Sequence, residues 1–365
     1  MKNKPEKVDQ NRLLILDLFR IVACLLVTGV HVSSTWIYDY SVGSFGFKCA
    51  MFWNAVSSAG PMLFFMLSGM VMLDNTRPDI PISRLWYRNI LRLILAYTIW
   101  SCIYTGHAWW GHYPFNSETI RLFIDEFFVG GTMYHMWFIP ALVPIYVVLP
   151  IIRPALKDVK NCRYFIICYV LISYLVPGVL NLNLAKGYML EAALAKFSFI
   201  SFGLYAFMFV LGWYLRAEKI VLPVRTAVYT AGVIMFVNAF RGGINRSVEE
   251  SAVYLGNWSA TGFSNVVYLA AFALVFVSLQ KRFGPGAVFK GKLEFLNRLI
   301  PELSKLTFGI YLIHPMFLGA TTRLLERIYL PGLVRIPLQS LILFAISAPF
   351  IWVLSKIPVL KRYMV

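Results

Sequence analysis

The stretch DLFRIVACLLVTGVHVSS, Asp17 to Ser34, is apolar enough to be buried in lipid, yet it carries an aspartate, an arginine and a histidine. Ionisable side chains within a membrane helix are costly, and they face the interior of a bundle or a water-filled cavity. Arg20 and His31 are separated by three helical turns plus about 20°, so they share one face about 16 Å apart along the axis. Asp17 precedes Arg20 by one turn on much the same face. The stretch therefore predicts an amphipathic membrane helix whose polar stripe points into protein or water.

The composition of the whole chain is that of a membrane protein. Of its 365 residues 59% are hydrophobic and 14% are charged, with a mean hydropathy of +0.68. A soluble domain carries roughly a quarter charged residues. Apolar runs of about 20 residues, the length that crosses a bilayer as a helix, recur throughout. We therefore predict an all-α polytopic membrane protein with a single membrane domain over 1–365 and a short N-terminal segment, 1–12, in the cytoplasm.

The charges that flank the apolar runs predict an orientation. Most of the 34 lysines and arginines fall on one side of the predicted membrane, whereas acidic residues divide evenly. Basic residues concentrate in cytoplasmic segments, so both termini are predicted to be cytoplasmic. The ten predicted spans are 13–33, 49–73, 89–109, 136–155, 164–183, 197–215, 225–241, 261–280, 304–322 and 337–355.

The same counts exclude some classes of function. The formal net charge of +17 follows mostly from this asymmetry, so nucleic-acid binding is not needed to explain it. The five cysteines lie in or beside spans without a regular spacing, so they predict neither a disulfide framework nor a metal site.

Three arginines follow the second span. Arg84, Arg88 and Arg92 recur at every fourth position, which on a continuous helix forms one cationic stripe at the start of the third span. Snorkelling to lipid headgroups explains one or two such residues. Arg92 lies about a turn deeper, and three guanidinium groups at one helix end suit phosphates. We expect an anionic ligand there.

Further polar residues interrupt the later spans, and each has a structural and a functional interpretation. The structural interpretations are close helix packing at Ser68-Gly69, an interfacial position for Trp137, helix kinks at Pro140 and Pro144, and a satisfied core histidine at His314. An Asp17–Arg20 ion pair and an interfacial His31 are the corresponding interpretations of the first span. The functional candidates are Ser68, His135, Trp137, Tyr311 and His314.

Taken in order, these motifs resemble the acyltransferase-3 family of integral-membrane O-acyltransferases, particularly bacterial surface-polysaccharide O-acetyltransferases. The family's mark is an arginine, ten residues and a histidine in the first span, matched by Arg20 and His31 and preceded by Asp17. The LSG after FF, the arginine series, the HMWF segment and the late GIYLIH match as well. The matching motifs extend from Asp17 to His314.

The resemblance implies a reaction and its partners. Family members take an acyl group from cytoplasmic acyl-CoA, here most simply acetyl-CoA, and place it on a saccharide hydroxyl at the outer face of the bacterial inner membrane. The three arginines then hold the CoA phosphates, and no metal is needed. His31 acts as general base on the acceptor hydroxyl or as a transient acyl carrier. Arg20 stabilises the thioester oxyanion or the departing thiolate, and Asp17 orients Arg20. His135 and His314 are candidates for lining the acceptor side.

Two other classes of function fit some of these features. A transporter or flippase of a lipid-linked glycan or acylated sugar could use His31 as a proton relay and the arginines as a phosphate gate. The sequence contains no evident internal repeat, which argues against that class. A non-catalytic membrane sensor would not need so many ionisable groups within spans. The acyl group, the acceptor sugar and the oligomeric state are not readable from the sequence.

Overall fold

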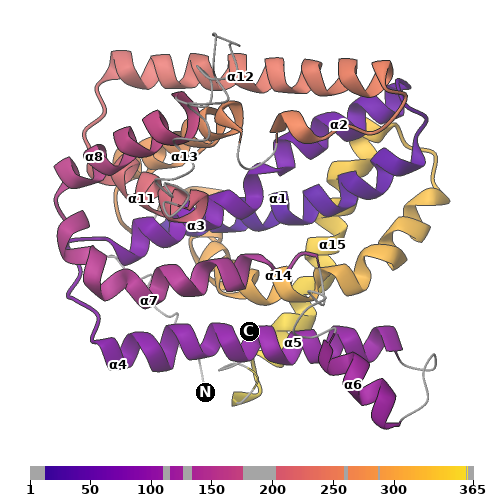
Figure 1. Ribbon diagram of the computed structural model, residues 1–365, viewed down its shortest axis with the longest axis horizontal. Helices are drawn as coiled ribbons and strands as arrows, with labels where there is room; N and C mark the ends of the chain where they lie inside the picture. Colours follow the sequence, from indigo (N-terminus) through magenta and orange to yellow (C-terminus); the bar gives the residue numbers. More distant parts are fainter. Residues whose placement is uncertain are drawn as a thin grey trace, which may run out of the picture.

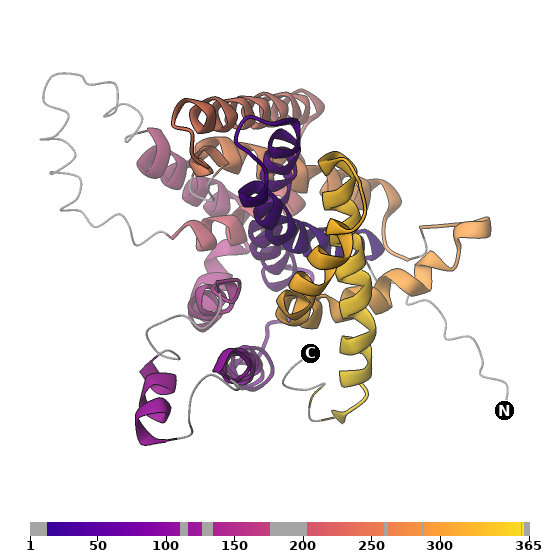
Figure 2. The same cartoon turned by 90° about the vertical axis from the view of Figure 1, so that its right-hand side faces the viewer.

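The computed structural model describes residues 13–109, 116–125, 134–175, 203–258, 262–286, 288–358 and 360. Within these ranges the chain forms helices and no strand, so the all-α prediction is confirmed. Its α-helices are α1 (Leu14–Asp39), α2 (Phe45–Ser57), α3 (Ala59–Met72), α4 (Ile82–Leu85), α5 (Leu91–Trp109), α6 (Ser117–Asp125), α7 (Phe138–Leu156), α8 (Val159–Val170), α11 (Leu204–Ala217), α12 (Leu222–Glu249), α13 (Phe263–Phe283), α14 (Leu296–Glu326) and α15 (Gly332–Leu354). Figure 1 and Figure 2 show α12 and α5 at opposite edges of the molecule, with α1 and α3 between them.

Six helical segments are long and apolar enough to cross a membrane by length and composition, and the protein is a polytopic membrane protein. They are Leu14–Asp39, Phe45–Met72, Phe138–Leu156, Leu222–Glu249, Phe263–Phe283 and Gly332–Leu354. The predicted fifth and sixth spans, 164–183 and 197–215, lie partly outside the described residues. Helices α5 and α14 have 19 and 31 residues and are not among the six. Both carry polar side chains, including Arg92 and His314, which lower their hydropathy.

The predicted second span is one span candidate, Phe45–Met72, whose helix is interrupted at Ser58. α2 ends at Ser57 and α3 begins at Ala59, with Ser58 between them. Pro61 accounts for the break, because it has no N–H to donate to the carbonyl of Ser57 and its ring clashes with that turn. Phe64 and Phe65 of α3 pack against Phe138 of α7, and α3 also packs closely against α11.

Helix α3 packs backbone against backbone with α11. A Cβ atom at Gly69 would lie 1.7 Å from the carbonyl oxygen of Phe209, and one at Gly212 would lie 2.2 Å from that of Met66. Only glycine fits at either position. The expected close packing at Ser68-Gly69 is therefore correct for Gly69.

Prolines also occur in α7 and α14, the helices at the predicted fourth and ninth spans. Pro140 was expected to interrupt the fourth span, but α7 begins at Phe138, so Pro140 lies in the first turn, where its missing N–H breaks no helical bond. Pro144 is inside the helix. His135 and Trp137 precede α7 in a turn, not in the span itself. At the predicted ninth span, 304–322, helix α14 extends beyond the prediction at both ends, from Leu296 through Pro315 to Glu326.

A buried carboxylate fixes the loop between α3 and α4. Asp74 is 2% exposed, and its Oδ1 accepts hydrogen bonds from the backbone N–H and hydroxyl of Thr76. Arg216 on α11 donates to its Oδ2 at 2.8 Å. Burial alone would raise the pKa of Asp74, but the Thr76 hydrogen bonds and the Arg216 charge outweigh it, so the pKa is lowered.

Arg153 of α7 also holds the loop between α3 and α4 in place. The Arg153 side chain is buried and donates to the backbone carbonyls of Met72, Asp74 and Arg77 at 2.9 to 3.2 Å. Its charge is paired with Asp79. These contacts hold the loop in place, and the loop in turn fixes the position of α4 and of the arginine series.

We expect Asp74→Ala to lower the free energy of unfolding by about 3 to 5 kcal/mol, because it leaves the Arg216 charge without its carboxylate in a buried site. Thermal unfolding in detergent measures this. Glu302→Gln is the control, since Glu302 and Lys305 form an exposed pair worth about 1 kcal/mol or less.

The lowered pKa of Asp74 adds a pH dependence. A carboxylate whose pKa is lower in the folded than in the unfolded state contributes stability near neutral pH and loses it as pH falls through the folded-state value. The stability difference between the wild type and Asp74→Ala should therefore shrink on acidification. Equal unfolding temperatures for the two proteins at pH 7 would contradict this role.

Candidate functional site

Two cavities lie next to each other among α1, α3, α7 and α14, and α5 also lines the second. The first, of about 540 Å³, is lined by His31 and His135, and we call it the histidine cavity. The second, of about 260 Å³, contains Arg20, Arg88 and Arg92, and we call it the arginine cavity. The histidine cavity is lined by Val27, Val30, His31, Ser34, Thr35, Tyr38, Ser58, Pro61, Phe64, Tyr134, His135, Trp137, Phe138, Tyr311 and Leu318. The arginine cavity is lined by Arg20, Phe64, Ser68, Arg88, Asn89, Arg92, Leu93, Phe138, Leu142, Tyr146, Thr307, Phe308 and Tyr311.

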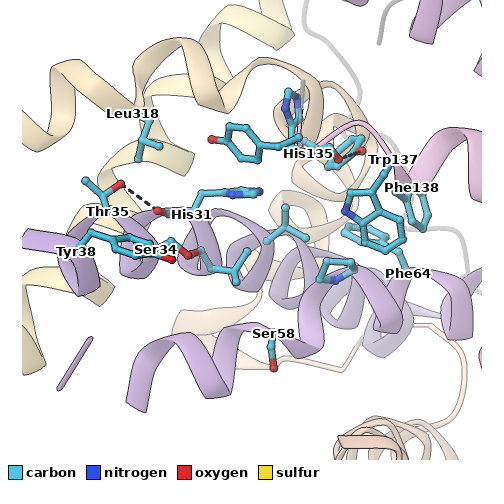
Figure 3. Close-up of a pocket in the computed structure, with 15 residues that line it drawn as sticks. His31, Ser34, Thr35, Tyr38, Ser58, Phe64, His135, Trp137, Phe138 and Leu318 are labelled. Carbon is cyan, nitrogen blue, oxygen red and sulfur yellow. Dashed lines mark hydrogen bonds between the residues drawn. The ribbon is translucent and has the colours of Figure 1, made fainter. Parts of the chain in front are cut away.

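Three histidines from three parts of the chain cluster at the first cavity, and two of them, His31 and His135, line it. His31 projects from α1 into it, with His135 across from it (Figure 3). The ring centroid of His31 is 5.2 Å from that of His314 on α14 and 6.3 Å from that of His135. Tyr134 lies edge-on to His31 at 4.9 Å. The sequence therefore brings together residues from its first, middle and last thirds.

The ring of His314 is oriented by the proline that follows it. Pro315 cannot donate to the carbonyl of Tyr311, four residues earlier, and Nδ1 of His314 lies 2.8 Å from that oxygen instead. A carbonyl only accepts, so Nδ1 carries the proton and Nε2 is left as an acceptor. His314 is fully buried, and no described residue is hydrogen-bonded to its Nε2. The ring of His314 stacks on that of His31 and lines neither cavity.

The three histidines do not form a metal site. Among the residues that the structure describes, no group of three histidine, cysteine or carboxylate side chains is arranged to hold a metal ion. We therefore treat the cluster as a set of acid–base and hydrogen-bonding groups.

Asp17 and Arg20 are joined through a third residue that the sequence prediction missed. The hydroxyl of Ser304 on α14 donates to Oδ1 of Asp17 at 2.7 Å and accepts from Nη1 of Arg20 at 3.1 Å. The direct Arg20–Asp17 distance is 3.4 Å. Asp17 is buried, whereas the side chain of Arg20 is 35% exposed and reaches into the arginine cavity. A signal for Ser304 exists, because it precedes Tyr311 and His314 by 7 and 10 residues on one helix face.

The three arginines of the predicted stripe line two hollows, and Arg88 lines both. Residues Trp86–Ile90 form a π-helix between α4 and α5. Arg84 and Arg88 line a separate surface depression. Arg88 and Arg92 line the arginine cavity, and Arg92 lies over the ring of Phe308 at 5.4 Å.

The other predicted site residues divide between the two cavities. Trp137 lines the histidine cavity, Ser68 lines the arginine cavity beside Tyr146, and Tyr311 lines both. Tyr311 also donates from its hydroxyl to the backbone carbonyl of His135 at 2.5 Å. Ser68 is therefore apart from His135 and His314, the two histidines with which it was grouped. Phe64 and Phe138 were not predicted, since they look like ordinary core residues in apolar runs.

The protein is therefore a polytopic membrane protein whose apolar helical bundle contains two adjoining cavities of different chemistry. The model of the acyltransferase-3 family, described as an acyltransferase domain, matches residues 13–356. The chain belongs to this family and is a membrane acyltransferase, as the resemblance of its motifs implied. No curated protein and no solved structure matches the chain.

We expect Ser304→Ala to lower the free energy of unfolding by about 1.5 to 3 kcal/mol, the range for hydrogen bonds to charged groups. Its hydroxyl is the buried partner of both Asp17 and Arg20. Ser347→Ala is the matched control, because that buried hydroxyl bonds only to the carbonyl of Leu343 on its own helix. Equal losses in thermal unfolding for the two variants would contradict a special role for Ser304.

Proposed function

We propose that the protein is an O-acyltransferase that transfers an acyl group, acetyl above all, from cytoplasmic acyl-CoA to a saccharide hydroxyl. The observation that carries this proposal is the adjacency of a cavity with arginines to a cavity with His31. Arginine side chains suit a phosphorylated donor, and a histidine suits the activation of a hydroxyl group. Within the family, the motifs resemble those of bacterial surface-polysaccharide O-acetyltransferases, so the enterobacterial common antigen is the first acceptor to test.

The donor is proposed to enter at the arginine cavity. Arg88 and Arg92 present guanidinium groups there, and guanidinium forks match phosphate oxygens geometrically. The excess of lysine and arginine on the same side of the predicted topology puts this end at the cytoplasm, where acyl-CoA is found. A pantetheine arm then carries the thioester toward Arg20.

The proposed chemistry is a single acyl transfer. The acceptor oxygen attacks the thioester carbonyl carbon, and His31 takes the hydroxyl proton; a C–O bond forms, the C–S bond breaks, and the proton leaves with CoA as the thiol. A neutral imidazole, with an ordinary pKa of about 6.5, suits this task. Arg20 faces the developing oxyanion, and Asp17 with Ser304 holds the guanidinium in place.

The acceptor is proposed to bind in the histidine cavity. Its volume of about 540 Å³ falls within the range of small-molecule sites, and Trp137 and Tyr134 offer aromatic faces to a sugar ring. Tyr38, Ser34 and Thr35 at the other end offer hydroxyl groups (Figure 3). A saccharide can therefore meet both apolar and polar partners there.

We expect His31→Ala to reduce acyl transfer about 10²- to 10⁴-fold, the usual cost of losing a general base, while acyl-CoA binding is retained. Transfer of radiolabelled acetyl from acetyl-CoA to membrane glycans, with binding measured separately, checks this. His107→Ala is the control, because His107 is exposed on α5 and lines neither cavity. Transfer at the wild-type rate by His31→Ala would end the general-base assignment.

The same assay separates catalysis from a structural ion pair. Arg20→Ala should lose about 10²- to 10³-fold in transfer if it stabilises the oxyanion, and Asp17→Asn should lose less, because its task is orientation. A purely structural pair would instead lower the amount of folded protein in both variants. A transporter or flippase would release no CoA thiol from acetyl-CoA in detergent.

Replacement of Arg88 and Arg92 should weaken acyl-CoA binding more than it harms folding. We expect the double alanine variant to raise the acetyl-CoA dissociation constant at least about tenfold, and lysines to restore it only in part if the contacts are forked. Arg298→Ala is the control, an exposed arginine at the start of α14 that lines neither cavity. Unchanged affinity in the double variant would leave these arginines as topology signals only.

A further inference from the structure

The histidine cavity and the arginine cavity share part of their lining. Phe64, Phe138 and Tyr311 line both, and of the described residues no other does so. The three side chains come from α3, α7 and α14, the helices on which the two cavities depend. They form a boundary between the proposed donor site and the proposed acceptor site, and we call them the aromatic wall.

The three rings form a continuous row. The centroid of Phe138 is 5.9 Å from that of Phe64 and 5.9 Å from that of Tyr311. Such separations are those of aromatic rings in direct contact, so neighbouring rings leave little room between them for an alkyl chain. Figure 3 shows Phe64 and Phe138 gathered at one end of the histidine cavity, beyond the ring of His31.

Two of the three side chains of the aromatic wall are held in place by further contacts. Phe138 packs against Phe65, with centroids 4.6 Å apart. Tyr311 is 5% exposed and is fixed by its hydrogen bond to the carbonyl of His135. Phe64 is half-buried, so it is the ring with the most room to move. The wall is therefore a shaped, largely rigid surface.

Acyl transfer requires the two substrates to meet at this wall. If the donor phosphates bind Arg88 and Arg92 and the acceptor hydroxyl lies at His31, the thioester carbonyl has to reach the boundary, with its alkyl chain among the three rings. We propose that Phe64, Phe138 and Tyr311 select the acyl group by size, admitting acetyl and excluding longer saturated chains. This inference rests on the proposed function and adds the residues that set its donor specificity.

The expected size of the acyl-chain selectivity can be taken from other fitted apolar pockets. One methylene too many in a fitted apolar pocket costs roughly 10- to 200-fold in kcat/KM. The wild type should therefore use acetyl-CoA far better than butyryl-CoA. Phe64→Ala or Phe138→Ala should open the wall and raise the butyryl-to-acetyl ratio of kcat/KM by about tenfold or more.

The experiment uses inverted membrane vesicles from bacteria that express the full chain, since these contain the natural acceptors. Acetyl-, propionyl- and butyryl-CoA, each labelled in the acyl carbonyl, are supplied separately, and label in the saccharide fraction is measured above vesicles that lack the protein. Phe317→Ala is the matched control, a half-buried phenylalanine of α14 that packs on Phe350 and lines neither cavity. Its acyl-length ratios should equal those of the wild type.

Phe138→Leu is included in case Phe138→Ala does not fold, and Phe64 is exposed enough for its alanine variant to be tolerated. A raised butyryl-to-acetyl ratio in Phe64→Ala and in a Phe138 variant, with the Phe317→Ala ratio unchanged, supports the wall. Acetyl transfer with unchanged ratios in those variants, or equal use of acetyl- and butyryl-CoA by the wild type, overturns the wall and leaves the proposed function standing. Absence of label from every acyl-CoA in the wild type overturns both.

Discussion

The hydrogen bonds of Ser304 to Asp17 and Arg20 are the constraint on which the site depends. Two charged side chains in an apolar helix have to be paired and hydrogen-bonded, and they require a neighbouring helix at that depth. Helix α14 supplies it, and the bond between Ser304 and Asp17 sets α14 against α1. With that contact made, His314 lies beside His31 three turns further along. The polar residues of the first helix thus determine which helix lies against it and with what register.

Prolines complete the same arrangement. Pro61 accounts for the interruption of the helix at Ser58, and Phe64, three residues after Pro61, lines both cavities. Pro315 leaves a carbonyl without its helical donor, and the imidazole of His314 satisfies it. Each proline costs helical hydrogen bonding, and each defines the position of a side chain at the site. The two cavities are therefore products of interruptions in otherwise ordinary membrane helices.

Much of this could be predicted from the sequence, because it depends on periodicity and composition. The all-α membrane fold and the shared face of Arg20 and His31 follow from the helical repeat, and the order of motifs indicated the family. The partnership of Ser304 with Asp17 could not be predicted in the same way, since it joins residues 287 positions apart. Nor does a local pattern reveal that Arg84 lines a different hollow from Arg92. Phe64 and Phe138 are indistinguishable from core residues until the two cavities are located.

In the proposed reaction, donor and acceptor meet at the boundary of two cavities within one helical bundle. The most direct test is an electron cryo-microscopy structure of the protein with a non-hydrolysable thioether analogue of acetyl-CoA. This meeting point predicts the phosphates at Arg88 and Arg92, the pantetheine within the arginine cavity, and the acyl carbonyl beside Phe138 and Tyr311. A nucleotide bound at the histidine cavity, or an acyl group directed away from the aromatic wall, would contradict it.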